Sequence, residues 1–443
     1  MKRVGLILLW GLGLWVQGQQ GDNREYDFTI FGQVVEKEKI AVPDFQMAPG
    51  AEGFRNEWQT INQVLRDDLK NSGYFEVLSQ DRIQLIRSPH AGPIDFEEWG
   101  SIETQHLVVG TMKAEGDQLW LEVRLYEVAS QQSILAKLYR GKPSLVRKMA
   151  HVVADEIMIH LRNSRFATSK LIFTRQTKVQ AQAELPVKEL FIMDYDGYNP
   201  LPITRGGIAL SPSAAKLGKE TYLAYSVFEN AYTFNATYGI YLKPNLRSKP
   251  RPLFSDKNHR ATSPSISPDG KKLAFALVSD GNVDIYVMGL DGSDLLRLTR
   301  NPGVDTNPSW APGGRSLLFT SDRTGTPQIY RMDADGLNKV RLTIENPYND
   351  SAVWNPRHDY MAYVSRFDNN FDIFIMDLQT RKNYRVTRLQ GSNEDPCWSP
   401  DGEQLAFTSN RDGHWQIYAI NKDGTNLRQI THSGENRDPV WVP

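Results

Sequence analysis

Asp-Pro-Cys-Trp-Ser-Pro-Asp-Gly, at residues 395–402, begins the stretch that decides the fold, and the apolar segments 405–409 and 416–418 follow it. A similar sequence without tryptophan, Pro-Ser-Ile-Ser-Pro-Asp-Gly, occupies residues 264–270. The tryptophans of the repeat are spaced by 44, 44 and 43 residues, at Trp310, Trp354, Trp398 and Trp441. Such a constant period, with several short strands in each unit, is typical of a β-propeller.

The order of strands predicts how the propeller closes. Segments 170–174, 189–193 and 201–204 match the second, third and fourth strands of the repeat, but nothing before them matches the first. Residues 439–443 form a first strand with nothing after it. We therefore expect the C-terminal strand to complete the ring, which removes the exposed edges of an open stack. With a divergent unit at about 208–254 and copies starting near 262, 306, 350 and 394, the sequence predicts six blades.

A smaller α/β domain is expected before the propeller. Apolar residues recur at helical spacing over 55–72 and again over 144–161. Two helices laid on a small mixed sheet are the simplest way to bury both apolar faces. The predicted strands of this sheet are 40–45, 74–78, 107–112, 119–128 and 133–139.

The N-terminus has the pattern of a secretory signal peptide, because a short basic region precedes an apolar run from Val4 to Val16. This run is shorter than the roughly 20 residues of a membrane-spanning helix. We expect cleavage after Gly18, no lipid anchor there because no cysteine follows, and no later membrane span. The predicted organisation is a signal peptide at 1–18, an N-terminal arm at 19–38, an α/β domain at 39–165 and a six-bladed propeller at 166–443.

Composition and motifs argue against several classes of protein. Fifty-one basic residues nearly balance 52 acidic residues, so no global basic field exists to attract nucleic acid. The single cysteine, Cys397, excludes an intramolecular disulfide and is expected to be buried and unreactive. No Gly-x-Ser-x-Gly, His-Glu-x-x-His or phosphate-binding glycine motif occurs. The spacing of His106, His151 and His160 is not that of metal ligands. We expect no enzyme, cofactor or metal.

Residues that the repeats share are expected to build the scaffold. The Asp-Gly pairs at 291–292, 335–336 and 423–424 suit tight turns, and the tryptophans suit packing between blades. The short connections before each first strand differ from copy to copy. In a propeller they gather on one face, around the mouth of the central channel, so we expect partner binding there. These connections are 258–260, 304–306, 348–350, 392–395 and 434–438.

Several segments resemble the TolB family over nearly the whole chain: Leu-Lys-Asn-Ser-Gly at 69–73, Phe-Ala-Thr-Ser-Lys-Leu at 166–171, Asp-Tyr-Asp-Gly-Tyr-Asn at 194–199 and the segment 267–277. The hexapeptide is specific, whereas many propellers share the Trp-Ser-Pro-Asp-Gly repeat. The resemblance implies a non-enzymatic periplasmic scaffold of the Tol-Pal system of Gram-negative bacteria. Its implied role is to maintain outer-membrane integrity and support envelope constriction during cell division.

The resemblance also implies two partners. The channel face would bind the lipoprotein Pal, and the arm would bind TolA; other outer-membrane proteins are further candidates. His259 and Thr306 match family positions implicated in Pal binding. The geometric argument alone adds Arg260, Asp305, Asn349, Asp350, Asn393, Asp395 and Asp438. For TolA, the apolar arm residues are Tyr26, Phe28, Ile30 and Phe31.

Two other functions remain open from the sequence. One is a lyase or hydrolase at the channel mouth that uses Asp350, Asp395 and His259, although these residues form no recognisable acid-base pair. The other is an independent propeller that binds a sugar or a peptide. If Pal and TolA both bind, coupling between the two sites must be reciprocal in affinity.

Overall fold

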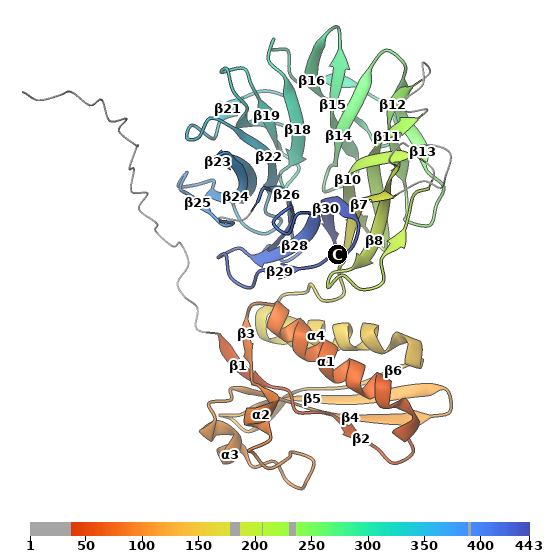
Figure 1. The fold of residues 1–443 in the computed structure, drawn as a ribbon, viewed down its shortest axis with the longest axis vertical. Coiled ribbons are helices and arrows are strands. Elements are labelled where there is room, and N and C mark those ends of the chain that lie inside the picture. The colour runs from red at the N-terminus through yellow and green to blue at the C-terminus, as the bar shows by residue number, and fades with distance from the viewer. Residues whose placement is uncertain (1–36, 178–186, 206, 230–235, 389–390) are drawn as a thin grey trace, which may run out of the picture.

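A computed structural model describes residues 37–177, 187–205, 207–229, 236–388 and 391–443 as an α/β domain followed by a β-propeller (Figure 1). The predicted signal peptide, residues 19–36 of the predicted arm and all four residues proposed for TolA lie outside the described residues. Among the described residues, no helix has the length and apolar character needed to cross a membrane.

The first domain contains the predicted mixed sheet, with strand order β3-β1-β4-β5-β6 and β2 paired with β4. Strand β1 is parallel to β3 and β4, whereas β4, β5 and β6 are antiparallel. The strands are β1 (Glu38–Ala41), β2 (Gln46–Met47), β3 (Phe75–Val77), β4 (His106–Glu115), β5 (Gln118–Glu127) and β6 (Gln132–Gly141).

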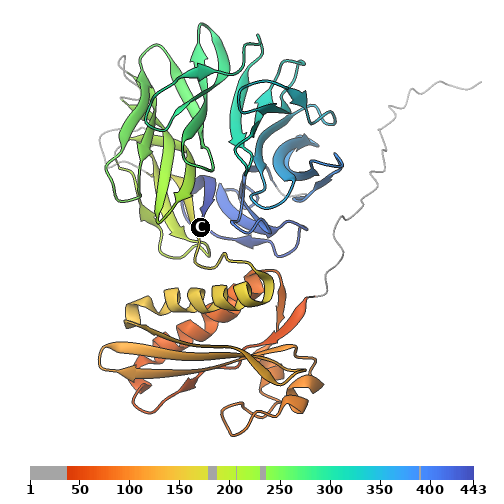
Figure 2. The ribbon, with the colours of Figure 1, turned by 180° about the vertical axis from the view of Figure 1, so that it is seen from behind.

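Two long helices, α1 (Arg55–Asn71) and α4 (Val146–Arg162), confirm the two helices predicted from periodicity. They lie between the sheet and the propeller (Figures 1 and 2). Leu65 and Ile157, at the centres of their apolar faces, are fully buried. Shorter helices were not predicted, because one or two turns carry no readable period. These are η1 (Glu52–Phe54), α2 (Gln80–Ile83), α3 (Phe96–Ser101) and η2 (Pro143–Leu145).

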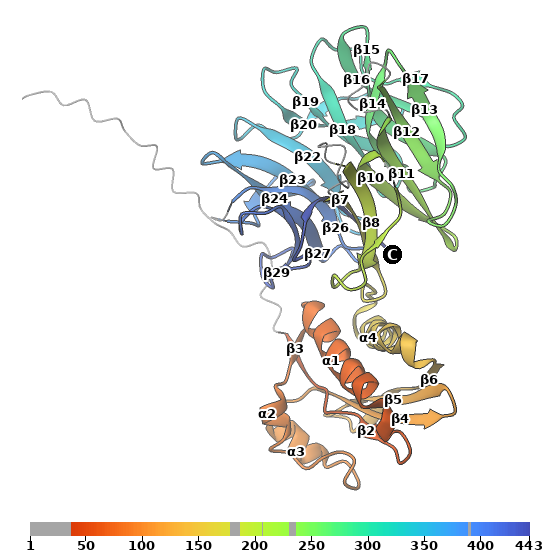
Figure 3. The same ribbon diagram turned by 45° about the vertical axis from the view of Figure 1, so that its right-hand side comes forward.

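Four separate four-stranded sheets follow one another in chain order in the described part of the propeller (Figure 3). The first two contain β14 (Arg260–Ile266), β15 (Lys272–Ser279), β16 (Asn282–Gly289) and β17 (Leu296–Arg297), then β18 (Asp305–Trp310), β19 (Ser316–Ser321), β20 (Gln328–Asp333) and β21 (Val340–Arg341). The other two contain β22 (Asn349–Trp354), β23 (Tyr360–Phe367), β24 (Asn370–Asp377) and β25 (Asn383–Arg385), then β26 (Asn393–Trp398), β27 (Gln404–Ser409), β28 (Gln416–Asn421) and β29 (Arg428–Gln429).

The remaining strands form one eight-stranded sheet, so four of the six predicted blades are found as separate four-stranded sheets. Its order is β13-β12-β11-β10-β8-β7-β30, with β9 paired to β8. Strands β8 and β10 are joined by a single parallel pair, Lys188 with Ile208. The strands are β7 (Lys170–Thr177), β8 (Val187–Asp194), β9 (Leu201–Pro202), β10 (Ile208–Leu217), β11 (Glu220–Glu229), β12 (Thr237–Lys243), β13 (Arg251–Asp256) and β30 (Glu435–Val442).

The C-terminal strand pairs with the beginning of the propeller, as predicted. Strand β30 is antiparallel to β7, with Val440 opposite Ile172 and Trp441 opposite Leu171. The C-terminus therefore lies close to the boundary between the two domains (Figure 1).

The repeated tryptophans pack between neighbouring sheets, as predicted. Trp310 is 7 % exposed, and its Nε1 donates to the carbonyl oxygen of Ser265 in the preceding sheet at 3.1 Å. Trp398 does the same to Val353 at 3.2 Å. The turn residue Gly336 has a φ of +84°, and a Cβ there would lie 2.8 Å from the carbonyl oxygen of Leu298. The repeat therefore specifies the ring and its turns.

One apolar core extends through both domains. It combines Leu65 of α1 and Ile157 of α4 with Leu171, Tyr195 and Trp441 from the propeller. Burial of these side chains holds the domains together, because apolar area removed from water stabilises by about 25 cal/mol per Å².

Candidate functional site

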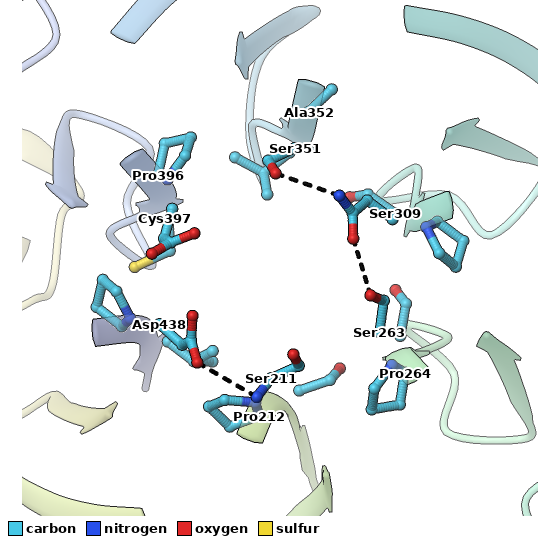
Figure 4. A pocket seen from close by; sticks show the side chains of 18 of the residues that line it. Ser211, Pro212, Ser263, Pro264, Ser309, Ser351, Ala352, Pro396, Cys397 and Asp438 are labelled. Atoms are coloured by element: carbon cyan, nitrogen blue, oxygen red, sulfur yellow. Dashed lines mark hydrogen bonds between the residues drawn. The ribbon is translucent and has the colours of Figure 1, made fainter. Parts of the chain in front are cut away.

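The innermost strand of each repeat contributes to a cavity of about 280 Å³ at the centre of the propeller. Six strands line it: β10, β14, β18, β22, β26 and β30. Figure 4 shows side chains from these strands arranged around the open space.

Six equivalent polar residues, one per inner strand, line this cavity, and we call them the channel ring. Each has a φ between 48° and 54° and lies at a register shift in its strand pairing. A bulge redirects a side chain, and positive φ is costly for residues other than glycine, so the fold maintains strain at all six positions. The channel ring consists of Ser211, Ser263, Asn307, Ser351, Asp395 and Asp438.

Proline follows the channel-ring residue in five of the six strands, in the dipeptides ending at Pro212, Pro264, Pro308, Pro396 and Pro439. Proline has no backbone N–H, so the bulge leaves no unpaired donor at that position. The sequence thus encodes the bulge locally, once per repeat.

One side of the channel ring is neutral and internally hydrogen-bonded. Ser263 Oγ donates to Asn307 Oδ1 at 2.8 Å, and Asn307 Nδ2 donates to Ser351 Oγ at 3.3 Å. The same amide donates to Asp350 Oδ1 at 2.9 Å. These bonds hold the side chains in fixed directions around the opening.

The other side is acidic. Asp438 Oδ2 accepts from Thr174 Oγ1 at 3.1 Å and from the backbone N–H of Ser211 at 3.4 Å. Burial, together with the charges of Asp438 and Glu394, raises the pKa of Asp395 to about 7. Burial also raises the pKa of Glu394, although Arg437 lies 3.3 Å away. Asp395 is only partly exposed, and a carboxylate that is partly withdrawn from water without a cation of its own is costly in the free protein.

The structure places the predicted Pal-binding residues in different environments. Asp395 and Asp438 belong to the channel ring. His259 precedes β14, has a side chain 37 % exposed, and lies 3.1 Å from Asp256 through its Nδ1 atom. Arg260 is exposed, and its guanidinium lies 4.6 Å from the ring centre of Tyr238.

Thr306 and Asp350 are partly exposed on inner strands, each directly before a channel-ring residue. Asp350 is held by donors on both oxygens: Thr320 Oγ1 donates to Oδ1 at 2.7 Å and the Tyr348 hydroxyl to Oδ2 at 3.1 Å. These contacts fix the carboxylate but leave it partly accessible.

Asp305, Asn349 and Asn393 are buried to 0–1 % exposure, which corrects their nomination as contact residues. Asn393 Nδ2 donates to Asp372 Oδ1 of the preceding sheet at 2.9 Å. Asn349 makes the equivalent bond to Gln328 at 3.0 Å, and Asp305 pairs with Arg323 at 3.0 Å. Their side chains connect the scaffold and present no surface to a partner. Alternating accessibility in a strand cannot be predicted across an unrecognised bulge.

The neutral members of the channel ring, Ser211, Ser263, Asn307 and Ser351, were not nominated from the sequence. A signal for three of them was present, because a polar residue followed by proline recurs near the start of each unit. Ser351 precedes Ala352 instead, so only its place in the repeat would have identified it.

The geometry does not assemble the proposed lyase or hydrolase site. Of Asp350, Asp395 and His259, only Asp395 lines the cavity, and no histidine is among the described lining residues. General acid-base catalysis needs its groups within hydrogen-bond reach of one substrate. Elsewhere in the described residues, side-chain atoms of Asp68, His151 and Asp196 that could bind a metal ion lie within 4.8 Å of one another, at the boundary between the domains.

Both domains are similar to known proteins. A family model described as the TolB beta propeller domain matches residues 162–373 and 366–443, and one described as the TolB amino-terminal domain matches residues 27–134. A Tol-Pal system protein TolB from Desulfosudis oleivorans is 33% identical over 285 residues, or 63% of this chain. The aligned region spans 61% of that relative's length. The crystal structure of TolB from Acinetobacter baumannii is similar over 92% of this chain and 97% of its own, with a TM-score of 0.78 and 26% identity.

Proposed function

Because the chain belongs to the TolB family, we propose that it is a periplasmic component of the Tol-Pal system. It acts by binding other proteins and carries out no catalysis. The absence of an assembled acid-base site among the described residues of the cavity supports this choice over the enzymatic alternative.

The channel ring is the observation on which the proposal rests. The tryptophans and the buried amides already connect the sheets of the propeller, so closure of the ring does not require six strained residues around one opening. Strain that the surrounding structure maintains is a reason to expect function. We place Pal on this face, in contact with the channel ring and the partly exposed residues around it: His259, Arg260, Thr306, Asp350, Asp395 and Asp438.

The eight-stranded sheet is proposed to act as two blades, which gives the six-bladed propeller. The single Lys188–Ile208 pair is the only parallel pairing among the described residues of that sheet. On either side of it stand four antiparallel strands, as in the separate sheets. The domain limits 39–165 and 166–443 are retained in this proposal.

The remaining parts of the function stay predictions. TolA is proposed to bind the arm through Tyr26, Phe28, Ile30 and Phe31, after cleavage of the signal peptide. A protein that binds both partners would connect the outer membrane to the inner-membrane complex, and so maintain envelope integrity and support constriction during division.

A pull-down from an envelope extract tests the Pal assignment. Wild-type protein is expected to recover Pal, and a double variant, His259→Ala with Thr306→Ala, is expected to lose it. His358→Ala is the matched control, because His358 is a partly exposed propeller histidine outside the proposed face. Undiminished recovery by the double variant would reject the site. Recovery of a glycan or peptide in place of Pal would favour the independent binding propeller.

A further inference from the structure

A buried polar cluster joins the two domains at a place that the proposed function does not use. Asp68 comes from α1 and His151 from α4, whereas Tyr195 and Asp196 lie in the turn after β8. The Tyr195 hydroxyl donates to Asp68 Oδ1 at 2.6 Å, and His151 Nδ1 lies 2.8 Å from Asp68 Oδ2. Asp68 thereby holds one group from its own domain and one from the propeller.

His151 has an unused nitrogen in this cluster. Its side chain is 5 % exposed, and Nε2 has no hydrogen-bond partner. The nearest carboxylate oxygen on the propeller side is Asp196 Oδ2, at 4.0 Å. An imidazole with a carboxylate on each side is stabilised in its protonated form, which can donate from both nitrogens.

The charged groups around His151 come from every element that packs there. Arg147 of α4 bonds to Asp196, and the guanidinium of Arg428 of β29 lies 5.9 Å from the ring centre of Tyr195. Because Arg147 already neutralises part of the Asp196 charge, a metal cation at this carboxylate is disfavoured. The cluster is better described as a hydrogen-bonded contact in which His151 and Asp68 are both titratable.

The balance of effects on His151 is a net gain in proton affinity. Burial lowers its pKa, but the hydrogen bond to Asp68 and the charges of Asp68 and Asp196 raise it more. Burial also raises the pKa of Asp68, to about 6. Because Asp68 lies in the same domain as His151, the part of the raised His151 pKa that depends on docking is the charge of Asp196.

We propose that the buried contact of His151 with Asp68 and Asp196 is a pH-dependent latch between the α/β domain and the propeller. In its protonated form, His151 connects a carboxylate of its own domain to one of the propeller turn 194–199. Loss of that proton leaves Asp68 buried beside a neutral ring and removes the attraction to Asp196.

The sign of the effect follows from linkage. Since contact with Asp196 favours protonated His151 only when the domains are docked, this stabilisation is present while His151 is protonated and is lost as pH rises through its docked pKa, which lies above the ordinary 6.5. Domain docking should therefore weaken between neutral and alkaline pH. The equilibrium for opening should change by about tenfold for each unit by which docking raises the pKa.

Histidine NMR on the full chain tests the first step. We expect the His151 pKa to exceed 6.5 in the wild type and to fall in Asp196→Asn, which leaves the bond to Asp68 in place. His151→Gln assigns the signal. A wild-type pKa at or below 6.5, or one unchanged by Asp196→Asn, would overturn the proposal.

Hydrogen exchange, corrected for the intrinsic effect of pH, tests the second step. Amides in 163–169 and 194–199 should lose protection as pH rises from 6 to 9 in the wild type and in the control His358→Gln. The loss should be absent in His151→Gln. If that variant does not fold, Asp196→Asn provides the same comparison with a reduced loss. An unchanged pH dependence in the folded variant would refute the latch.

Discussion

Replacement of Asp395 by asparagine should stabilise the protein at neutral and alkaline pH. Asp395 is a channel-ring residue with a φ of +53°, and it lies near the acidic side chains of Asp438 and Glu394. Asparagine keeps the size and tolerates positive φ, but it carries no charge. The change therefore isolates the cost of a carboxylate that is partly withdrawn from water.

The magnitude follows from the pKa. Burial and the two neighbouring carboxylates raise the Asp395 pKa from 3.8 to about 7, a shift of about 3 units, and each unit corresponds to 1.36 kcal/mol. A folded-state pKa raised in this way lowers wild-type stability as pH rises from about 4 to about 7. The variant does not titrate there, so its stability relative to wild type should increase by up to about 4 kcal/mol over that interval.

Denaturant unfolding of both proteins at pH 4, 6 and 8 measures this difference. The comparison across pH removes any constant cost of the substitution. Asp81→Asn, at an exposed position in α2, is the matched control and should show no such trend. A difference between variant and wild type that stays constant from pH 4 to pH 8, or reverses, would refute the reasoning. The same variant should bind Pal more weakly, because residues kept for binding commonly reduce stability.

Two further substitutions and one deletion test the scaffold. Asn393→Ala removes one buried hydrogen bond from Asp372 and one from Arg411 and should cost about 1–3 kcal/mol in denaturant unfolding, with Pal affinity unchanged. Gly197→Ala places a Cβ 2.2 Å from the carbonyl oxygen of Ile430 and should lower the melting temperature far more than Gly50→Ala. Both glycines have positive φ, but the second has nothing within 4 Å, so equal effects would contradict the proposed close approach. Deletion of residues 435–443 removes β30 and opens the ring, so the truncated chain should lose the cooperative unfolding transition seen by circular dichroism.

The ring and the long helices could be predicted from the sequence because their signals are periodic. A spacing of 44 residues with a repeated tryptophan indicates one repeated unit of strands every 44 residues. The sequence also identified β30 as the missing first strand before β7. The helices α1 and α4 present their apolar residues at a spacing of three and four, which burial requires.

The site was predicted less well, because a bulge changes which side chains face the channel. Asn393 and Asp395 both precede Trp398, yet the first is buried between sheets and the second lines the cavity. A period of two cannot distinguish them when an extra residue interrupts the pairing.

Contacts between the two domains could also not be predicted from the sequence. His151 was considered only as a metal ligand and rejected on spacing, whereas its neighbours in the propeller, Tyr195 and Asp196, lie 44 and 45 positions away. Such long-range pairs become visible only when the two domains are placed together.

The affinity of purified Pal for the channel face tests the central proposal most directly. Isothermal titration should show binding to the wild type and to His358→Gln with equal affinity. A double variant, Asp395→Asn with Asp438→Asn, should bind at least tenfold more weakly while remaining folded. Equal affinity of all three proteins for Pal would contradict the assignment of the channel ring as the binding site.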